Sequence, residues 1–128
     1  MAIRVEHTTI SVAGFRFAGA RAGLKKNGNP DVALAVADRA VPAGAVFTTN
    51  LVRAAPVEIA AERARRGRAR AILVNSGCAN ACTGDAGFAA AEVTSGAVAQ
   101  AIGAPAEQVL PASTGVIGLV LDSSKVIA

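Results

Sequence analysis

The first half of the chain alternates apolar and polar positions, a pattern typical of half-buried β-strands. Residues 7–12, 15–24 and 31–37 each follow this pattern. Residues 25–30 interrupt it with an Asn-Gly pair, which supplies the positive φ angles of a tight turn. The pattern therefore predicts an antiparallel hairpin, with a further strand over residues 45–50.

The second half predicts a helix, a strand and a second helix. Pro56 suits the first position of a helix, where its missing N–H is harmless. This helix is expected to reach about Arg66 and to stop at Gly67, and Glu62 lies one turn before Arg66 and can pair with it. The apolar residues 70–74 follow as a short, buried strand.

The second helix is expected to run from near Asp85 to Gly103, with Pro105 just beyond its end. One face of this helix should pack tightly on a sheet, because it carries the side chains of Phe88, Ala91, Ser95, Val98 and Ile102. Two last strands, 109–110 and 117–121, are expected on either side of a Thr-Gly turn.

This order of elements predicts the fold class. Locally paired strands followed by helix, strand, helix and strand indicate an α/β layered sandwich, here incomplete, with a mixed, largely antiparallel sheet. The 128 residues suit a single domain, 1–128, or a portion of a larger protein. They contain neither of the two glycine-rich phosphate-binding motifs, so a doubly wound nucleotide-binding fold is not expected.

Composition narrows the class of protein further. Apolar residues make up 52% and charged residues 17%, which argues against disorder. Aromatic residues make up only 3%, so the core must consist of Ala, Val, Leu and Ile. The first residues lack the apolar core of a signal peptide, and the longest uncharged stretches, of which 108–121 is one, are too short to cross a bilayer. We therefore expect a cytoplasmic protein with no membrane partner.

The formal net charge of +4 comes largely from arginines. The densest basic run comprises Arg63, Arg65, Arg66, Arg68 and Arg70. We interpret this run as a solvated helix end, where basic side chains complement the helix dipole. Weak steering of anionic ligands is the alternative. Because no aromatic residue interleaves with the run, a nucleic-acid partner is not expected.

Thr114 and Gly115 form the first candidate for chemistry. A hydroxyl residue followed by glycine can aim a side-chain O–H and a backbone N–H at one point. Two such donors stabilise the oxyanion that develops during acyl transfer. An ordinary glycine turn is the alternative.

The segment 75–84 is the second candidate, because a strand that leads into a helix start clusters backbone N–H groups and can bind an anion. The alternative is that Asn75, Ser76 and Asn80 only satisfy hydrogen bonds of a turn.

Other reactive side chains are interpreted as structural. Cys78 and Cys82 are expected to be small buried residues, because no base is placed near them and His7 gives no zinc-ligand spacing. His7 itself is taken as a structural or surface histidine. Asp31 and Asp38 bracket a predicted strand and are expected to serve turns.

Several short segments, in order along the chain, carry a family resemblance. They are Gly-Phe-Arg-Phe-Ala-Gly at 14–19, Ala-Gly-Leu-Lys at 22–25, Asp-Val-Ala-Leu at 31–34, Ala-Val-Phe-Thr-Thr-Asn at 45–50, Ala-Ala-Pro-Val at 54–57, Asn-Ser-Gly-Cys-Ala-Asn-Ala-Cys-Thr-Gly at 75–84 and Ala-Ser-Thr-Gly-Val-Ile-Gly at 112–118. With them the chain resembles the N-terminal part of the α chain of ornithine acetyltransferases, the bifunctional glutamate N-acetyltransferases of arginine biosynthesis.

The resemblance implies transfer of an acetyl group from N-acetylornithine, or in some members from acetyl-CoA, to glutamate. The precursor cleaves itself, and the new N-terminal Thr carries the acetyl group as an ester. Thr114 and Gly115 match the oxyanion-stabilising positions. No metal or organic cofactor is implied. The implied partners are the small-molecule substrates, the remaining β chain of the precursor and further copies in an oligomer.

The chain also departs from the family pattern. The nucleophile's Ala-Thr-Met-Leu segment and the preceding Lys-Gly-x-Gly-Met segment are absent from the 128 residues, so we expect no activity from the chain alone. Cys78 stands where the family has Asn, and residues 122–125 depart from the usual Pro-Met-Asp-Lys. The alternatives are a non-catalytic remnant or binding module on this fold, and a related amidase or acyltransferase with another acyl substrate. Unpaired apolar edges lead us to expect that the isolated chain oligomerises or aggregates.

Overall fold

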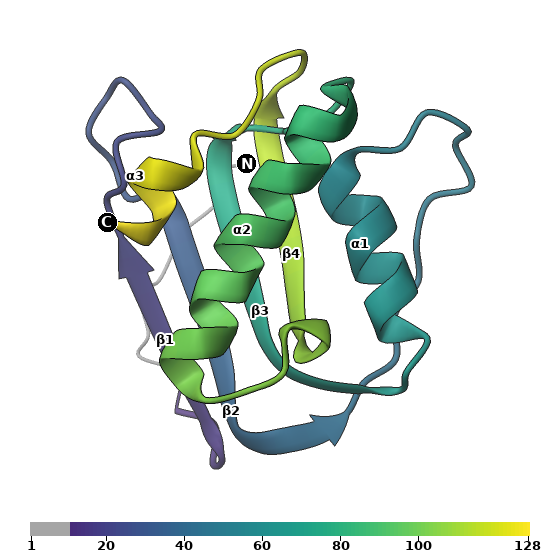
Figure 1. Cartoon of the computed structure of the whole chain (residues 1–128). Coiled ribbons are helices and arrows are strands. Elements are labelled where there is room, and N and C mark those ends of the chain that lie inside the picture. Colours follow the sequence, from purple (N-terminus) through teal and green to yellow (C-terminus); the bar gives the residue numbers. More distant parts are fainter. Residues whose placement is uncertain (1–10) are drawn as a thin grey trace, which may run out of the picture.

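A four-stranded sheet forms the centre of the computed structural model, which describes residues 11–128 (Figure 1). Its strands lie side by side in chain order: β1 (Phe15–Ala20), β2 (Val32–Pro42), β3 (Arg68–Cys78) and β4 (Val109–Val116). The first two pairings are antiparallel, and β3 pairs with β4 in parallel. The predicted α/β class with a mixed, largely antiparallel sheet is confirmed.

All helices cover the same face of this sheet (Figure 1). They are α1 (Ala55–Ala64), α2 (Gly84–Ile102), the short 3-10 helix η1 (Ala106–Gln108) and α3 (Ser123–Ile127). The main core lies between α2 and the sheet and consists of Val36, Ala71, Leu73, Ala99 and Val109. These small aliphatic side chains allow the helix to approach the strands closely, as the composition predicted.

The opposite face of the sheet carries no helix among residues 11–128. Strand side chains alternate between the two faces, so this face presents Phe17, 58% exposed, and Ile72, 45% exposed. Both lie in register with Ala35 of β2, which joins them into one apolar surface. An apolar surface of this kind supports the expectation of self-association, which stays a prediction.

The predicted hairpin is confirmed, but the prediction that a tight Asn-Gly turn connects its strands is wrong. β1 ends at Ala20, which pairs with Val32, so residues 21–31 form a long connection. A two-residue hairpin turn of the Asn-Gly type needs positive φ at both positions. Gly28 has a φ of 69°, whereas Asn27 is not among the residues with positive φ. The predicted strand over residues 7–12 falls largely outside the described residues.

The predicted strand over residues 45–50 is also wrong, because this segment is coil. Its β-branched residues favoured a strand, yet its polar side chains bind the local backbone instead. Thr48 Oγ1 accepts a hydrogen bond from Asn50 N at 3.2 Å, and Asn50 Oδ1 accepts one from Val52 N at 2.9 Å. Such bonds compete with strand pairing. Val46 is 98% exposed and therefore contributes nothing to a core.

Both predicted helices are confirmed. Pro56 lies at the start of α1, and Glu62 Oε1 lies 3.2 Å from Arg66 Nη2. α2 ends at Gly103, which adopts the left-handed conformation with a φ of 63° and accommodates the end of the helix. The strand expected at 70–74 extends further, over the whole of β3.

The buried face of α2 differs slightly from the predicted one. Ala91 and Ser95 are buried, whereas Phe88 is partly exposed. Gly87 and Thr94 are buried in its place. The buried side therefore follows the smallest side chains rather than the largest apolar one, because the helix packs closely on the strands.

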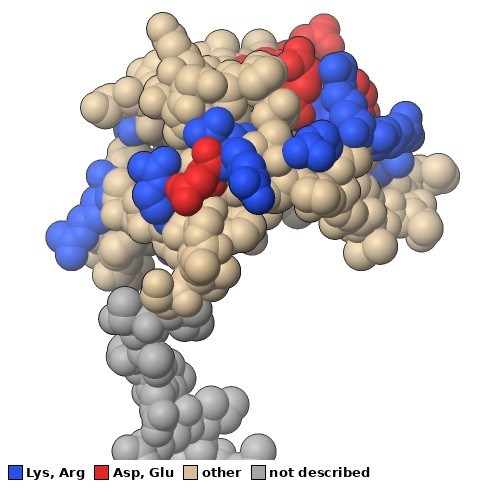
Figure 2. All heavy atoms as spheres, turned by 90° about the horizontal axis from the view of Figure 1, so that it is seen from below, with Lys and Arg blue, Asp and Glu red and all other residues tan. Residues whose placement is uncertain are grey.

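The basic run is not the uniform solvated helix end that was predicted. Arg68 and Arg70 belong to β3. Seen from below, the molecule presents several Lys and Arg side chains on its surface (Figure 2). The Arg70 Nε donates to the carbonyl of Ala37 at 2.9 Å, and Arg68 donates to that of Ala40. The pairing of β2 with β3 shifts in this part of β2. The two arginines thus satisfy carbonyl groups near an irregularity of the sheet.

Arg63 also contradicts the prediction that the basic run is solvated, because this residue is only 3% exposed. Its Nη1 donates to Ser95 Oγ of α2 and to the carbonyl of Val109 in β4, both at 2.8 Å. Its Nη2 pairs with the carboxylate of Glu92. One buried guanidinium therefore ties α1 to α2 and to the start of β4.

Replacing Arg63 with Met should lower the free energy of unfolding by about 3 kcal/mol, because it leaves the buried carbonyl of Val109 without its donor. Urea denaturation followed by circular dichroism measures the change. The control is Arg66→Met, which removes an exposed pair with Glu62 and should cost less than about 1 kcal/mol. Equal losses in the two variants would contradict the clamping role.

Candidate active site

The two segments singled out in the sequence meet at one end of the sheet. β3 and β4 run in parallel, which places Ser76 beside Thr114 and Gly77 beside Gly115. β3 continues to Cys78 rather than turning into a helix at residues 75–77, and β4 continues through the Thr-Gly pair rather than turning there. The turn follows at residues 117–118, and residues 117–121 are not a strand. Pairing between distant strands thus overrides the local preference of glycine for turns.

Glycine is required at position 115. Its φ is 132°, a conformation that side-chain-bearing residues rarely adopt. A Cβ at this position would lie 2.6 Å from the backbone nitrogen of Cys78 and even closer to the carbonyl carbon of Gly77. The backbone of β4 therefore approaches that of β3 more closely than any other residue type allows.

Asn75 joins the two strands just before this contact. It is buried beneath the helices, its Nδ2 donates to the carbonyl of Cys78 at 2.8 Å, and its Oδ1 accepts from Ser113 Oγ at 2.5 Å. Both polar atoms of a buried amide are therefore satisfied. The bond to Ser113 sets the position of β4 one residue before Thr114.

Asn80 does the same for the segment beyond β4. It is fully buried, its Nδ2 donates to the carbonyl of Gly87 at 2.8 Å, and its Oδ1 accepts from the N–H of Leu121 at 3.2 Å. The alternative prediction, that Asn75, Ser76 and Asn80 only satisfy hydrogen bonds of a turn, is wrong for Asn75 and Asn80, because each amide oxygen accepts from a residue on a distant segment, Ser113 and Leu121. The bonds of Asn80 also connect the first turn of α2 to the chain that follows the Thr-Gly pair.

Thr114 lies on the face of the sheet that carries no helix. It is in register with Ser76, and alternation along β3 places Ser76 on the same side as Ile72 and Val74. Thr114 and Gly115 are both exposed. The hydrogen bonds among residues 11–128 include none to the Thr114 hydroxyl, whereas the neighbouring Ser113 hydroxyl donates to Asn75.

The two cysteines differ from each other. Cys78 is buried, as predicted, and its Sγ donates to the carbonyl of Leu119 at 3.2 Å. Cys82 is exposed and has a φ of 58°, so the prediction that it is buried is wrong. It lies in the short connection between β3 and α2. His7 lies outside the described residues.

The carboxylate of Asp31 organises the loop beside the site, as expected of a turn residue. It accepts hydrogen bonds from the N–H groups of Ala22 and Leu24 at 2.6 Å and of Lys25 at 2.9 Å. The Lys25 N–H is the largest cause that lowers the pKa of Asp31, and desolvation opposes it. The Asp31 carbonyl in turn accepts from the N–H of Ser76 at 2.8 Å, which holds the loop against β3.

Asp38 does not bind a turn, as was predicted, but pairs with a side chain of the neighbouring strand. Its carboxylate lies 3.6 Å from Arg16 Nε across the β1–β2 pair, and both side chains are exposed.

Residues 11–128 bring together no group of three or more His, Cys, Asp or Glu side chains that could hold a metal ion. In the same range, no helix combines the length and the apolar character needed to cross a membrane.

Comparison with known proteins identifies similar sequences. The model of the ArgJ family matches residues 16–128. The arginine biosynthesis bifunctional protein ArgJ of Nitratidesulfovibrio vulgaris is 52% identical over 116 residues, which cover 90% of this chain and 30% of that protein. The ArgJ protein of Geobacter sulfurreducens is 48% identical over 117 residues, which cover 91% of this chain and 30% of that protein. The chain thus spans about 30% of the length of these relatives.

Two solved structures share the fold. The ArgJ protein of Bacillus halodurans superposes with a TM-score of 0.85 at 34% identity, over 90% of this chain and 60% of that one. The ornithine acetyltransferase of Mycobacterium tuberculosis, solved in complex with ornithine, superposes with a TM-score of 0.85 at 45% identity, over 90% of this chain and 63% of that one.

Gly115→Ala should lower the free energy of unfolding by about 3 kcal/mol, because the added methyl group meets the backbone of β3 and the φ angle is unfavourable. Gly118→Ala is the matched control, since it also has a positive φ but open space around it, and it should cost about 1 kcal/mol. Urea denaturation compares the two. A smaller loss in Gly115→Ala than in Gly118→Ala would show that the strands can separate without cost.

Asp31→Asn should destabilise the chain at neutral pH and less so in acid. The folded-state pKa of Asp31 lies below its ordinary value of 3.8, so the carboxylate stabilises the fold above that value. The stabilisation is lost as the pH falls through the folded-state pKa. The difference between wild type and variant, measured by urea denaturation at pH 7 and near pH 3, should therefore shrink in acid. Asp38→Asn is the control and should change stability little, and a pH-independent difference for Asp31→Asn would refute the assignment.

Proposed function

The chain belongs to the ArgJ family, and from this we propose that it forms the N-terminal part of an ornithine acetyltransferase. In this proposal residues 1–128 are one domain of a cytoplasmic enzyme of arginine biosynthesis. The whole enzyme moves an acetyl group from N-acetylornithine to glutamate through an acyl-threonine. The domain supplies the oxyanion hole. The observation that carries the proposal is the exposed Thr114–Gly115 pair on a strand whose position is fixed by close backbone contact.

The chemistry follows from where charge develops. Attack on an acetyl carbonyl converts its oxygen into an oxyanion, which hydrogen-bond donors stabilise most when they are already in place. The Thr114 hydroxyl and the Gly115 N–H would be those donors. The contact of Gly115 with Gly77 and the bond from Ser113 to Asn75 hold this part of β4 in place. Donors on such a strand need not reorganise as the charge forms.

The uncovered sheet face supports a partner for this site. Thr114 lies on the same side as the exposed Phe17 and Ile72. A polypeptide that covered these side chains would lie beside Thr114 and could present a nucleophile there. We propose that this partner is the remaining part of the precursor, and that the assembled pairs form an oligomer.

The 128 residues hold no Ala-Thr-Met-Leu segment, so the chain alone should transfer no acetyl group. A substrate carbonyl held near Thr114 would have no Thr nucleophile to attack it. The substrates of the proposal are N-acetylornithine and glutamate, and the ornithine bound in the Mycobacterium tuberculosis structure supports that substrate class.

Thr114→Ala should lower kcat by about 100-fold or more and change KM little, because it removes a donor that acts on the transition state. The assay uses a chimera in which this chain replaces the aligned part of the Mycobacterium tuberculosis enzyme, and measures acetyl transfer from N-acetylornithine to glutamate.

Thr114→Ser keeps the hydroxyl and should retain most of the activity. An unchanged rate in Thr114→Ala would remove the proposed role of this residue. A folded chimera without activity, even with Thr114 intact, would favour the alternative of a non-catalytic binding module.

A further inference from the structure

We propose that a cavity on the outer side of α1 binds a short aliphatic dicarboxylate. The cavity has a volume of about 320 Å³ and lies between α1 and the coil that precedes it. Its lining consists of Ala45, Phe47, Arg53, Ala61, Ala64 and Arg65. Neither Thr114 nor Gly115 takes part, so this site is separate from the candidate oxyanion hole.

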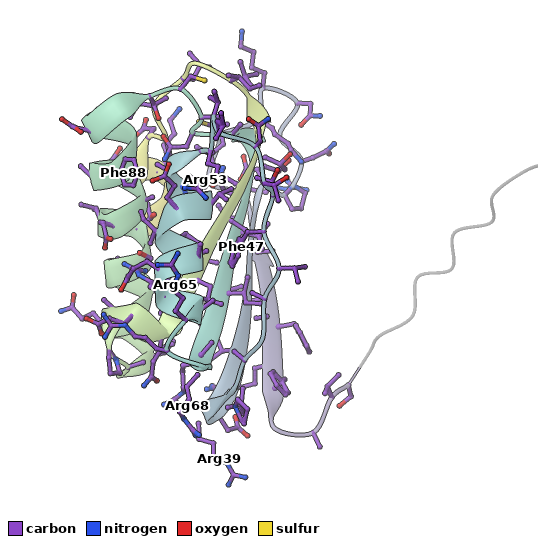
Figure 3. All side chains as sticks on the ribbon, turned by 90° about the vertical axis from the view of Figure 1, so that its right-hand side faces the viewer. Arg39, Phe47, Arg53, Arg65, Arg68 and Phe88 are labelled. Carbon is purple, nitrogen blue, oxygen red and sulfur yellow. The ribbon has the colours of Figure 1, made fainter. Side chains whose placement is uncertain are left out.

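Two arginines from opposite ends of one helix line this cavity. Arg53 precedes the first residue of α1 and Arg65 follows its last. Phe47, Arg53 and Arg65 lie on the same side of the molecule, along α1 (Figure 3). Two positive charges on one small cavity attract an anion with two negative groups better than one with a single group.

The charges of these arginines are incompletely balanced. The Nε of Arg53 lies 4.0 Å from Glu58 Oε1, a loose and exposed pair. Among residues 11–128, Arg65 has no carboxylate within 4.0 Å, whereas its neighbour Arg66 pairs with Glu62 at 3.2 Å. The cavity therefore carries a net positive charge, whereas Arg66 and Glu62 beside it balance each other.

The residues that line the cavity fit both the carboxylates of such a ligand and the methylene groups between them. A guanidinium presents a planar fork of N–H donors that matches a carboxylate. The methyl groups of Ala61 and Ala64 and the ring of Phe47 offer apolar contacts to methylene groups between two carboxylates. The volume lies at the lower end of the range for small-molecule sites, which favours a short ligand.

The site is also held in shape before any ligand arrives. The buried Arg63 fixes α1 to α2 and β4. The hydrogen bonds from Asn50 N to Thr48 and from Val52 N to Asn50 shape the coil on the other side. A preformed site avoids the cost of ordering its walls on binding.

Equilibrium dialysis of the full chain against radiolabelled succinate at low ionic strength tests the proposal, and it is insensitive to self-association. We expect saturable binding of one succinate per chain with a Kd of about 1 mM or lower. Arg53→Gln and Arg65→Gln should each weaken binding about tenfold, because each removes one charged hydrogen-bond partner. Ala61→Leu keeps both charges but fills the cavity, and it should abolish binding.

Arg66→Gln is the matched control, since it removes the same charge from the next residue, outside the cavity. Equal weakening by Arg66→Gln and Arg65→Gln would overturn the proposal in favour of diffuse attraction. So would an absence of saturable binding, unchanged binding in Ala61→Leu, or competition by inorganic phosphate as effective as that by unlabelled succinate. The variants at the exposed arginines decide the matter even if Ala61→Leu fails to fold. Because the assay needs no acetyl transfer, its outcome is independent of the proposed enzymatic function.

Discussion

The close approach of β4 to β3 at Gly115 is the constraint on which the rest of the site depends. No side chain fits between the two backbones there, so the parallel pairing can continue to the end of β3 only with glycine at this position. The pairing carries Thr114 to the exposed face and brings Ser113 within reach of Asn75. The geometry of the candidate site is thus set by backbone contact first and by polar side chains second.

The sequence predicted those parts of the fold that have local causes. Pro56 and Gly103 mark helix ends through their own backbone preferences, and both predictions are confirmed. The prediction of a strand over residues 45–50 was wrong, because a high strand propensity produces no strand where there is no neighbouring strand to pair with. The burial of Arg63 could not be predicted either, since its acceptors lie 32 and 46 residues further along the chain.

In the candidate site, too, the sequence predicted what depends on local residues and missed what depends on distant ones. Residue types alone drew attention to Thr114 and Gly115 and to the segment that contains Asn75. Local patterns nevertheless placed the Thr-Gly pair in a turn, because glycine with a hydroxyl neighbour is common in turns. Its true place in a strand depends on a partner 38 residues earlier, which no local signal reports. The family resemblance connected the two segments before any geometry was known.

The parallel pairing of β3 with β4 also has a consequence for biosynthesis. β1, β2 and β3 pair in chain order, so a nascent polypeptide can assemble them while α2 and β4 are still unsynthesised. During that interval the edge of β3 is open, and its unpaired backbone is a template for another growing chain. Completion of the last strand therefore ends a period of vulnerability to misassembly, and synthesis that pauses within α2 would prolong it.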